Sequence, residues 1–341
     1  MDVRGRTDSA PANATTVIPA NAGIPGRAQT SRATRAWDGE SCPAVRDEGW
    51  TGFGNLTAVT GIRPGGVSKG GTMPQVAVGA RSEVGRVRTL NEDAYLEGER
   101  VWLVADGMGG HAAGDIASRL AVESLRELDA ADLTPARVNA AVARANAVVV
   151  GHGRQHPQAR GLGTTVTGLA EVRVGGVAHW AVFNVGDSRV YRYADGRLQR
   201  TTVDHSEVEE LVARGLIADD EARDHPARHV ITRSVGMIPA PRVDVWVLPQ
   251  IPGERFLLCS DGLSSELTDD EIADLLAGHT DPREAASALV EAVLATPARD
   301  NVTVVVVDVL GDEAGTGDEA TVPHDLRAAP DAEPGLEEEK Q

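Results

Sequence analysis

The order of strand-like and helix-like segments is the feature that most restricts the fold of this 341-residue chain. Short aliphatic runs typical of buried strands come in groups, and amphipathic patterns typical of helices come mainly in pairs. We expect strands at 75–79, 101–105, 164–172, 177–185, 188–193, 243–248, 255–260 and 302–309, and helices at 114–129, 134–150, 206–224, 268–277 and 282–296. Because strands and helices do not alternate regularly, the pattern predicts an α+β domain with layered antiparallel sheets.

Two terminal segments differ from this periodic region. Residues 1–72 contain 12 Gly and 5 Pro and no sustained apolar period, which predicts a disordered segment. Residues 311–341 carry 10 acidic and 2 basic residues, which predicts an acidic disordered tail. The sequence therefore predicts one folded domain, residues 73–310. It leaves open whether Met73 is the natural start and residues 1–72 are a gene-prediction artefact.

Composition excludes several classes of site. The formal net charge of −18 argues against nucleic-acid binding, which needs a basic surface. Lys69 and Lys340 are the only lysines, so the domain has neither a GxxxxGK phosphate loop nor a Schiff-base or kinase-type lysine. Cys42 and Cys259 are far apart and indicate a reducing compartment rather than a disulfide framework.

Two further absences narrow the function and the location. Neither cysteine has an arginine six residues later, so the Cys-x5-Arg loop of one phosphatase class is missing. No apolar run is long enough to cross a membrane, and the N-terminus has no apolar core of a secretory signal. We therefore expect a cytoplasmic protein that does not bind membranes.

Four short acidic signals lie beside the expected strands: Asn91-Glu92-Asp93, Asp106-Gly107, Asp261-Gly262 and Asp300-Asn301. Asp106 and Asp261 each come after a fully apolar run, and Asp-Gly reads as a turn after the strand. A carboxylate at the edge of a buried strand is costly unless it is paired or binds a metal. Several oxygen ligands with few histidine or cysteine candidates favour Mg²⁺ or Mn²⁺ over zinc.

A longer series of motifs runs in order along the domain: Gly85-x-x-Arg88-x-x-Asn91-Glu92-Asp93, Val104-Ala-Asp106-Gly-Met-Gly-Gly-His111-x-x-Gly114-Asp115, Gly161-Leu-Gly-Thr-Thr165, Val185-Gly-Asp-Ser-Arg189, Cys259-Ser-Asp261-Gly262 and Asp300-Asn-Val-Thr303. This series resembles the metal-dependent protein phosphatases (PPM, the protein phosphatase 2C family) in their compact bacterial form. The resemblance covers about Val76 to Val309 and implies a four-layer sandwich, with two antiparallel β-sheets packed together and α-helices outside.

The resemblance also implies a set of metal ligands. Asp106 would bridge two Mn²⁺ or Mg²⁺ ions. Asp261 and Asp300 would hold one ion, and Glu92 and the Gly107 carbonyl would hold the other. Asp93 would lie beside the site, binding through water or supporting a ligand.

Catalysis would then need no nucleophile from the protein. Two metals can lower the pKa of a bridging water, and the resulting hydroxide can attack phosphorus in line. Arg88 matches the family's phosphate-binding arginine, whose planar fork suits a phosphoryl group. His111 either protonates the leaving alkoxide or is structural, because in eukaryotic members the proposed acid directly follows Asp-Gly, where this chain has Met108.

Three further segments have weaker assignments. Gly163-Thr164-Thr165 and Gly186-Asp187-Ser188-Arg189 are expected to be scaffold, with strand pairing and an internal Asp–Arg contact. Residues 204–225 correspond to the family's flap beside the site. Arg160 stands where bacterial relatives often carry an aspartate that helps to hold a third metal, so a third metal site is in doubt here.

The resemblance implies a phosphoserine and phosphothreonine protein phosphatase that opposes a bacterial serine/threonine kinase and acts as a monomer. Two other functions remain open. One is a phosphatase dedicated to a single regulator, such as an anti-anti-sigma factor. The other is a phosphoprotein-binding pseudophosphatase, which would be expected to have lost a metal aspartate, whereas Asp106, Asp261 and Asp300 are all present.

Overall fold

The computed structural model describes residues 75–109, 113–130, 132–223 and 225–311. The expectations for residues 1–72, for residues 312–341 and for His111 therefore fall outside the described residues. Within the described part of the chain, no helix has both the length and the apolar character needed to cross a membrane.

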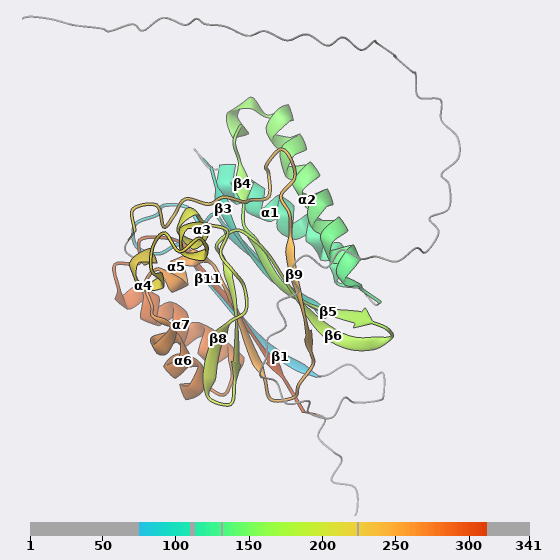
Figure 1. Ribbon diagram of the computed structural model, residues 1–341, viewed down its shortest axis with the longest axis vertical. Coiled ribbons are helices and arrows are strands. Elements are labelled where there is room, and N and C mark those ends of the chain that lie inside the picture. Colours follow the sequence, from blue (N-terminus) through green and yellow to red (C-terminus); the bar gives the residue numbers. More distant parts are fainter. Residues whose placement is uncertain (1–74, 110–112, 131, 224, 312–341) are drawn as a thin grey trace, which may run out of the picture. The chain divides into compact units, whose positions relative to one another are not determined.

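Two antiparallel sheets form the centre of the domain (Figure 1). The first has the strand order β1-β11-β10-β7-β8, and its strands are Val76–Glu83, Val302–Val309, Arg255–Cys259, Arg189–Ala194 and Arg197–Arg200. The second has the order β2-β3-β5-β6-β9, and its strands are Asp93–Glu97, Val101–Met108, Val166–Val174, Val177–Val185 and Asp244–Pro249. The two-residue strand β4 (Gly163–Thr164) pairs with the end of β3.

Helices cover the outer face of each sheet. The helices α1 (Ala113–Leu125) and α2 (Pro135–Gln155) lie on the second sheet, and α5 (Asp261–Ser264), α6 (Asp269–Gly278) and α7 (Pro282–Ala295) lie on the first (Figure 1). As Thr-Pro predicted, Thr134 caps α2 by accepting a hydrogen bond from the Arg137 N–H, with Pro135 in the first turn. Single 3₁₀ turns, η1 (Arg126–Leu128) and η2 (Pro157–Ala159), follow α1 and α2.

Three hydrophobic layers hold these elements together, which confirms the expected four-layer α+β sandwich. The layer between the two sheets contains the largest buried side chains. Trp180 makes edge-to-face contacts with Trp102 and Phe256, with ring centroids 6.0 and 6.1 Å apart. The remaining members of this layer are mainly valine and leucine, as expected from a chain with only 3% aromatic residues.

The structure corrects three local predictions. Asp106 and Gly107 do not form a turn after the strand, because β3 continues through them to Met108. The expected helix 206–224 is broken into α3 (Glu207–Ala213) and α4 (Asp219–Ala222), since Gly215 adopts a φ of +67° that a right-handed helix cannot accommodate. The strands β2 and β8 and the short helix α5 were not expected from the sequence.

Candidate metal and phosphate site

Asp106 is fixed by its own peptide groups at the end of β3. Its N–H donates to Thr165 Oγ1 at 2.9 Å, and its carbonyl oxygen accepts from the Thr164 hydroxyl and the Thr165 N–H, both at 2.9 Å. Thr165 Oγ1 also lies 2.7 Å from Ser188 Oγ in the turn before β7. The Gly-Thr-Thr motif is therefore scaffold, as expected, and its role is to hold the Asp106 backbone.

Asp93 stands opposite Asp106 in the β2–β3 ladder. Its Oδ2 accepts hydrogen bonds from Ser260 Oγ at 2.8 Å and Thr303 Oγ1 at 2.7 Å, whereas its Oδ1 is buried without a protein partner. Burial raises the pKa of Asp93 to about 7, and the charges of nearby carboxylates add to the rise, while the two hydroxyl groups oppose it. A buried carboxylate oxygen with no donor is a position where a cation or its bound water would be favourable.

Carboxylates from distant parts of the chain meet at Asp106. Burial raises the pKa of Asp106 well above its usual range, and Asp93, Asp261, Asp187 and Asp300 raise it further by their negative charge. These side chains come from β2, from the first residue of α5, from the turn before β7 and from the turn before β11. Such a group of acids is costly in the ionised form unless a cation compensates it.

Glu92 and the Gly107 carbonyl share one small space beside α1. A Cβ atom built on Gly114 would lie 2.7 Å from Glu92 Oε1 and 2.7 Å from the Gly107 oxygen. The backbone of this loop is held by the Gly107 N–H, which donates to the Glu92 carbonyl, and by Ser118 Oγ, which donates to the same oxygen at 2.6 Å. Glycine at position 114 therefore leaves room beside both oxygens, which the family resemblance assigns to one metal.

Asn301 connects the acidic loop before β2 to the start of β11. Its amide nitrogen donates to the carbonyls of Val84 and Leu90, and its Oδ1 accepts from the Glu92 N–H at 2.9 Å. The adjacent Asp300 is thereby placed next to Arg88. This accounts for the Asp-Asn spacing in the motif, in which one residue supplies a carboxylate and the next fixes the loop.

Arg88 lies among the predicted metal ligands. Its Nη2 donates to Asp300 Oδ2 at 2.8 Å, and its Nη1 is 3.8 Å from Glu92 Oε2. The hydrogen bond that Arg88 donates to Asp300 is the main cause that raises the pKa of the Arg88 guanidinium. The side chain is 47% exposed, so part of Arg88 is accessible from solvent.

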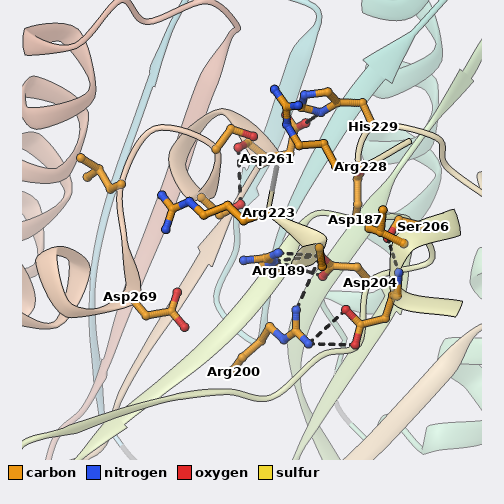
Figure 2. A pocket seen from close by; sticks show the side chains of 16 residues that line it. Asp187, Arg189, Arg200, Asp204, Ser206, Arg223, Arg228, His229, Asp261 and Asp269 are labelled. Atoms are coloured by element: carbon orange, nitrogen blue, oxygen red, sulfur yellow. Dashed lines mark hydrogen bonds and ion pairs between the residues drawn. The ribbon is translucent and has the colours of Figure 1, made fainter. Parts of the chain in front are cut away.

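Asp261 has two neighbours that sequence reasoning did not assign to the site. His229 Nδ1 lies 3.6 Å from Asp261 Oδ2. Asp187 is buried, its Oδ1 has no partner, and burial together with the charge of Asp261 raises its pKa well above the usual range. Both residues line one cavity with Asp261 (Figure 2). The signal for Asp187 was present in Gly186-Asp187-Ser188-Arg189, which the sequence analysis assigned to scaffold.

The internal Asp–Arg contact expected in that motif is made with another aspartate. Arg189 Nε and Nη2 donate to Asp204 at 2.7 to 3.1 Å, and Arg189 Nη1 donates to Tyr191 Oη. Asp187 thus keeps a free carboxylate oxygen. Arg160, at the position where bacterial relatives often carry a third-metal aspartate, is an exposed residue after η2.

The structure thus brings together Arg88, Glu92, Asp93, Asp106, Gly107, Asp261 and Asp300. Within residues 75–311, setting aside the few undescribed positions, no three His, Cys, Asp or Glu side chains are already gathered closely enough to form a metal cluster. Asp300 is bonded to Arg88 instead, and Asp261 faces His229. The donor set consists of carboxylates and a carbonyl, which fits hard divalent cations.

Comparisons with known proteins agree with this geometry. Residues 85–305 match the family model described as protein phosphatase 2C. A Mycobacterium tuberculosis protein named serine/threonine protein phosphatase PstP is 39% identical over 243 residues, which cover 69% of this chain and 45% of that protein. A serine/threonine phosphatase stp of Listeria welshimeri is 31% identical, with 67% of this chain and 94% of that protein covered.

A solved structure supports the same relationship. The catalytic domain of serine threonine protein phosphatase PstP in complex with two manganese ions is 36% identical and has a TM-score of 0.62, with 69% of this chain and 99% of that chain covered. The chain therefore belongs to the protein phosphatase 2C family. It spans less than half the length of the mycobacterial relative, so the matched region corresponds to only part of that protein.

Proposed function

We propose that this protein is a metal-dependent phosphatase that hydrolyses phosphoserine and phosphothreonine in proteins. The observation that carries the proposal is that Asp93 and Asp106 lie opposite each other in the β2–β3 ladder, with Asp261 and Asp300 near enough that their charges add to burial in raising the pKa of both. The names of the mycobacterial and Listeria relatives support the same reaction. The presence of these aspartates disfavours a pseudophosphatase.

Two Mn²⁺ or Mg²⁺ ions bound here would activate a shared water as the nucleophile and neutralise charge on the phosphoryl oxygens. The residues that would hold them are Asp106 for both ions, Asp261 and Asp300 for one, and Glu92 with the Gly107 carbonyl for the other. A related catalytic domain that contains two manganese ions supports this number. Asp93 would hold a bound water in place through its free Oδ1.

Arg88 would orient the phosphoryl group. Asp300 fixes one edge of its guanidinium group at the border of the acidic site, and the exposed edge is available to phosphoryl oxygens. The fork would both align the phosphorus for attack and offset the developing negative charge.

A third cation has a better candidate than position 160. Asp187 and Asp261 line the same cavity, burial and the charge of Asp261 raise the pKa of Asp187, and Asp187 has an unpartnered, buried oxygen. If a further ion binds, these two carboxylates are its protein ligands. Arg160 by itself therefore does not exclude a third metal site.

The remaining parts of the functional prediction rest on the family relationship. They are a cognate bacterial serine/threonine kinase, phosphorylated protein substrates, a cytoplasmic location and a monomeric state. His111, the candidate acid for the leaving group, lies outside the described residues.

Hydrolysis of a phosphothreonine peptide by the full chain, with Mn²⁺ and with EDTA, tests the proposal. Asp106→Asn should abolish turnover and weaken Mn²⁺ binding, because one change removes a ligand from both ions. Asp195→Asn, at the exposed tip of the β7–β8 hairpin, is the matched control and should behave as the unaltered protein. Asp106→Asn activity within about threefold of the unaltered rate at saturating Mn²⁺, a difference of less than 1 kcal/mol in the barrier, would exclude the bridging role.

A further inference from the structure

A charged cavity of about 440 Å³ lies next to the candidate metal site (Figure 2). It is lined by Asp187 and Asp261, which belong to the acidic site, and by Arg189 of β7 and Arg200 of β8. The rest of the lining comes from α5, from the start of α6 and from residues 204–229. A cavity of this size can hold one or two side chains of a bound peptide.

Residues 204–230, called the excursion below, leave the first sheet after β8, and hydrogen bonds join the two ends of the segment at its base. Ser206 and Ile231 form an antiparallel bridge, the Glu207 N–H donates to the Val230 carbonyl at 2.9 Å, and the Thr232 N–H donates to the His205 carbonyl at 2.8 Å. The side chains that the segment contributes to the cavity are therefore held beside Asp261 by a fixed base.

Most charges in the cavity already have partners within the protein. Arg189 is bonded to Asp204, and Arg200 donates to Glu209 at 3.0 Å. Asp269 accepts a hydrogen bond from Tyr191 Oη at 3.1 Å. These groups therefore stabilise the walls of the cavity.

Arg223 and Arg228 differ from the other arginines of this cavity. Both are exposed, both come from the excursion, and both line the cavity with Asp261 (Figure 2). In the described part of the chain, neither guanidinium group makes a hydrogen bond or a close ion pair. Hydrogen bonds at the start of α6 lower the pKa of Glu271, and the charge of Arg223 reaches only as far as lowering it further. Arg88, the candidate phosphate ligand, does not line this cavity. The cavity thus offers two guanidinium groups that are not hydrogen-bonded to a described side chain, and both are separate from Arg88 at the acidic site.

We propose that Arg223 and Arg228 bind an anionic side chain of the substrate protein, close in sequence to the phosphorylated residue. The inference rests on the proposed function, because it assumes that the phosphorylated residue occupies the adjacent acidic site with its cations. Guanidinium groups bind carboxylate and phosphoryl oxygens in the same planar manner. The anion is therefore an aspartate or glutamate, or a second phosphoryl group, and substrates that carry one are preferred.

The experiment compares four small substrates with the full chain and Mn²⁺. Three are phosphothreonine peptides whose flanking residues are alanine, alanine with glutamates, or alanine with one phosphoserine, and the fourth is p-nitrophenyl phosphate. We expect the Arg223→Ala/Arg228→Ala variant to lower kcat/KM for the two anionic peptides by about 10- to 100-fold, as for the loss of a charge-assisted hydrogen bond. The loss should lie mainly in KM, since the contact is equal in ground and transition states.

The same variant should change kcat/KM for the alanine peptide and for p-nitrophenyl phosphate by less than about twofold, since surface changes away from the reacting atoms have small effects. Arg214→Ala is the matched control, because Arg214 lies on the same excursion but is bonded to Glu210 and does not line the cavity. Comparison of the glutamate and phosphoserine peptides identifies which anion is preferred.

Equal kcat/KM for the anionic and alanine peptides with the unaltered protein would overturn the proposal, as would an equal loss on all four substrates. A fluorescence-anisotropy titration with phosphonate analogues of the peptides separates this failure from failure of the proposed function. A protein that turns over none of the substrates but binds the anionic analogues through Arg223 and Arg228 would retain the docking role and lose the catalytic one. Analogue binding that the double variant leaves unchanged would overturn the docking role by itself.

Discussion

Asp93 links proton binding to folding stability. Its pKa is about 7 in the folded protein and close to 4 in an unfolded chain, so between these values the folded state holds a proton that the unfolded state releases. Without divalent cations, the free energy of unfolding should therefore fall as the pH rises from about 4 to 7. The raised pKa values of Asp106 and Asp187 act in the same direction.

Thermal unfolding in EDTA at several pH values checks this prediction. The Tm should decrease from pH 5 to pH 8, and Mn²⁺ should restore it most strongly at pH 8, where protons no longer compete for the carboxylates. Asp93→Asn should flatten part of the pH dependence in EDTA, because its amide does not titrate, while Asp195→Asn should leave the profile unchanged. A Tm in EDTA that rises over this interval would contradict the assignment.

Arg88 allows phosphate recognition to be separated from metal binding. Arg88→Ala removes a phosphate-binding fork but no metal ligand, so kcat/KM should fall by about 30- to 1000-fold, which corresponds to roughly 2–4 kcal/mol. Mn²⁺ affinity should not decrease, because Asp300 loses a competing partner. Arg88→Lys should recover only part of the rate, since a point charge does not replace a planar pair of donors.

Peptide kinetics and calorimetric Mn²⁺ titration on the two Arg88 variants decide between the possible roles. Unchanged kinetics would remove Arg88 from the site. Lost Mn²⁺ binding would instead mean that its contacts to Asp300 and Glu92 are structural.

Two glycines on neighbouring helices provide a matched test at the scale of the element. Gly114→Ala would place a Cβ 2.7 Å from Glu92 Oε1 and from the Gly107 oxygen, so it should weaken Mn²⁺ binding by about tenfold or more, a loss of at least about 1.4 kcal/mol. Gly151→Ala, in α2, meets no atom within 4 Å and should stabilise the helix by roughly 0.5–1 kcal/mol without affecting the metal.

Calorimetry with Mn²⁺ and thermal unfolding measure the two effects of these substitutions. Equal Mn²⁺ affinity in both variants would show that the space beside Gly114 is not part of the cation site.

The element that departs most from its sequence pattern is the excursion after β8. Its polar amphipathic pattern predicted one helix, but Gly215 divides it into two short helices, and its base is tied to residues 230–232. Arg223 and Arg228, which follow this break in the chain, line the cavity. An apolar period of 3.6 residues indicates which residues would share one face of a helix. It does not indicate where that helix begins or ends in the folded protein.

At the scale of the whole molecule, the first and last strands of the described domain pair with each other. β1 pairs with β11 along its full length from Val76 opposite Val309, and the Leu310 N–H donates to the Gln75 carbonyl at 2.8 Å. Removal of residues 1–72 and 311–341 should therefore leave the Tm and peptide hydrolysis nearly unchanged. Comparison of the shortened and full chains by thermal unfolding and kinetics tests this. A large drop in either quantity would mean that a terminal segment contributes to the domain or to its site.

The sequence by itself determined the class of fold and most of the candidate site. Apolar periodicity depends on local geometry, and so it located most strands and helices and the α+β class. The position of acidic residues at the edges of apolar strands singled out Asp106, Asp261 and Asp300, because ionised groups beside a buried strand need a specific partner.

Only the tertiary structure decided which of these residues face one another. Thr164 and Thr165 hydrogen-bond to the backbone of Asp106, and Arg189 pairs with Asp204 rather than with Asp187. Asp187 is left with an unpartnered oxygen in the cavity that Asp261 also lines. Each of these contacts is between residues that are separated in the chain. A motif records the types of its residues, but the pairing of charges depends on distances between strands and turns that only the packed sandwich fixes. For that reason Asp187 could be read as scaffold in the sequence and is a candidate ligand in the folded protein.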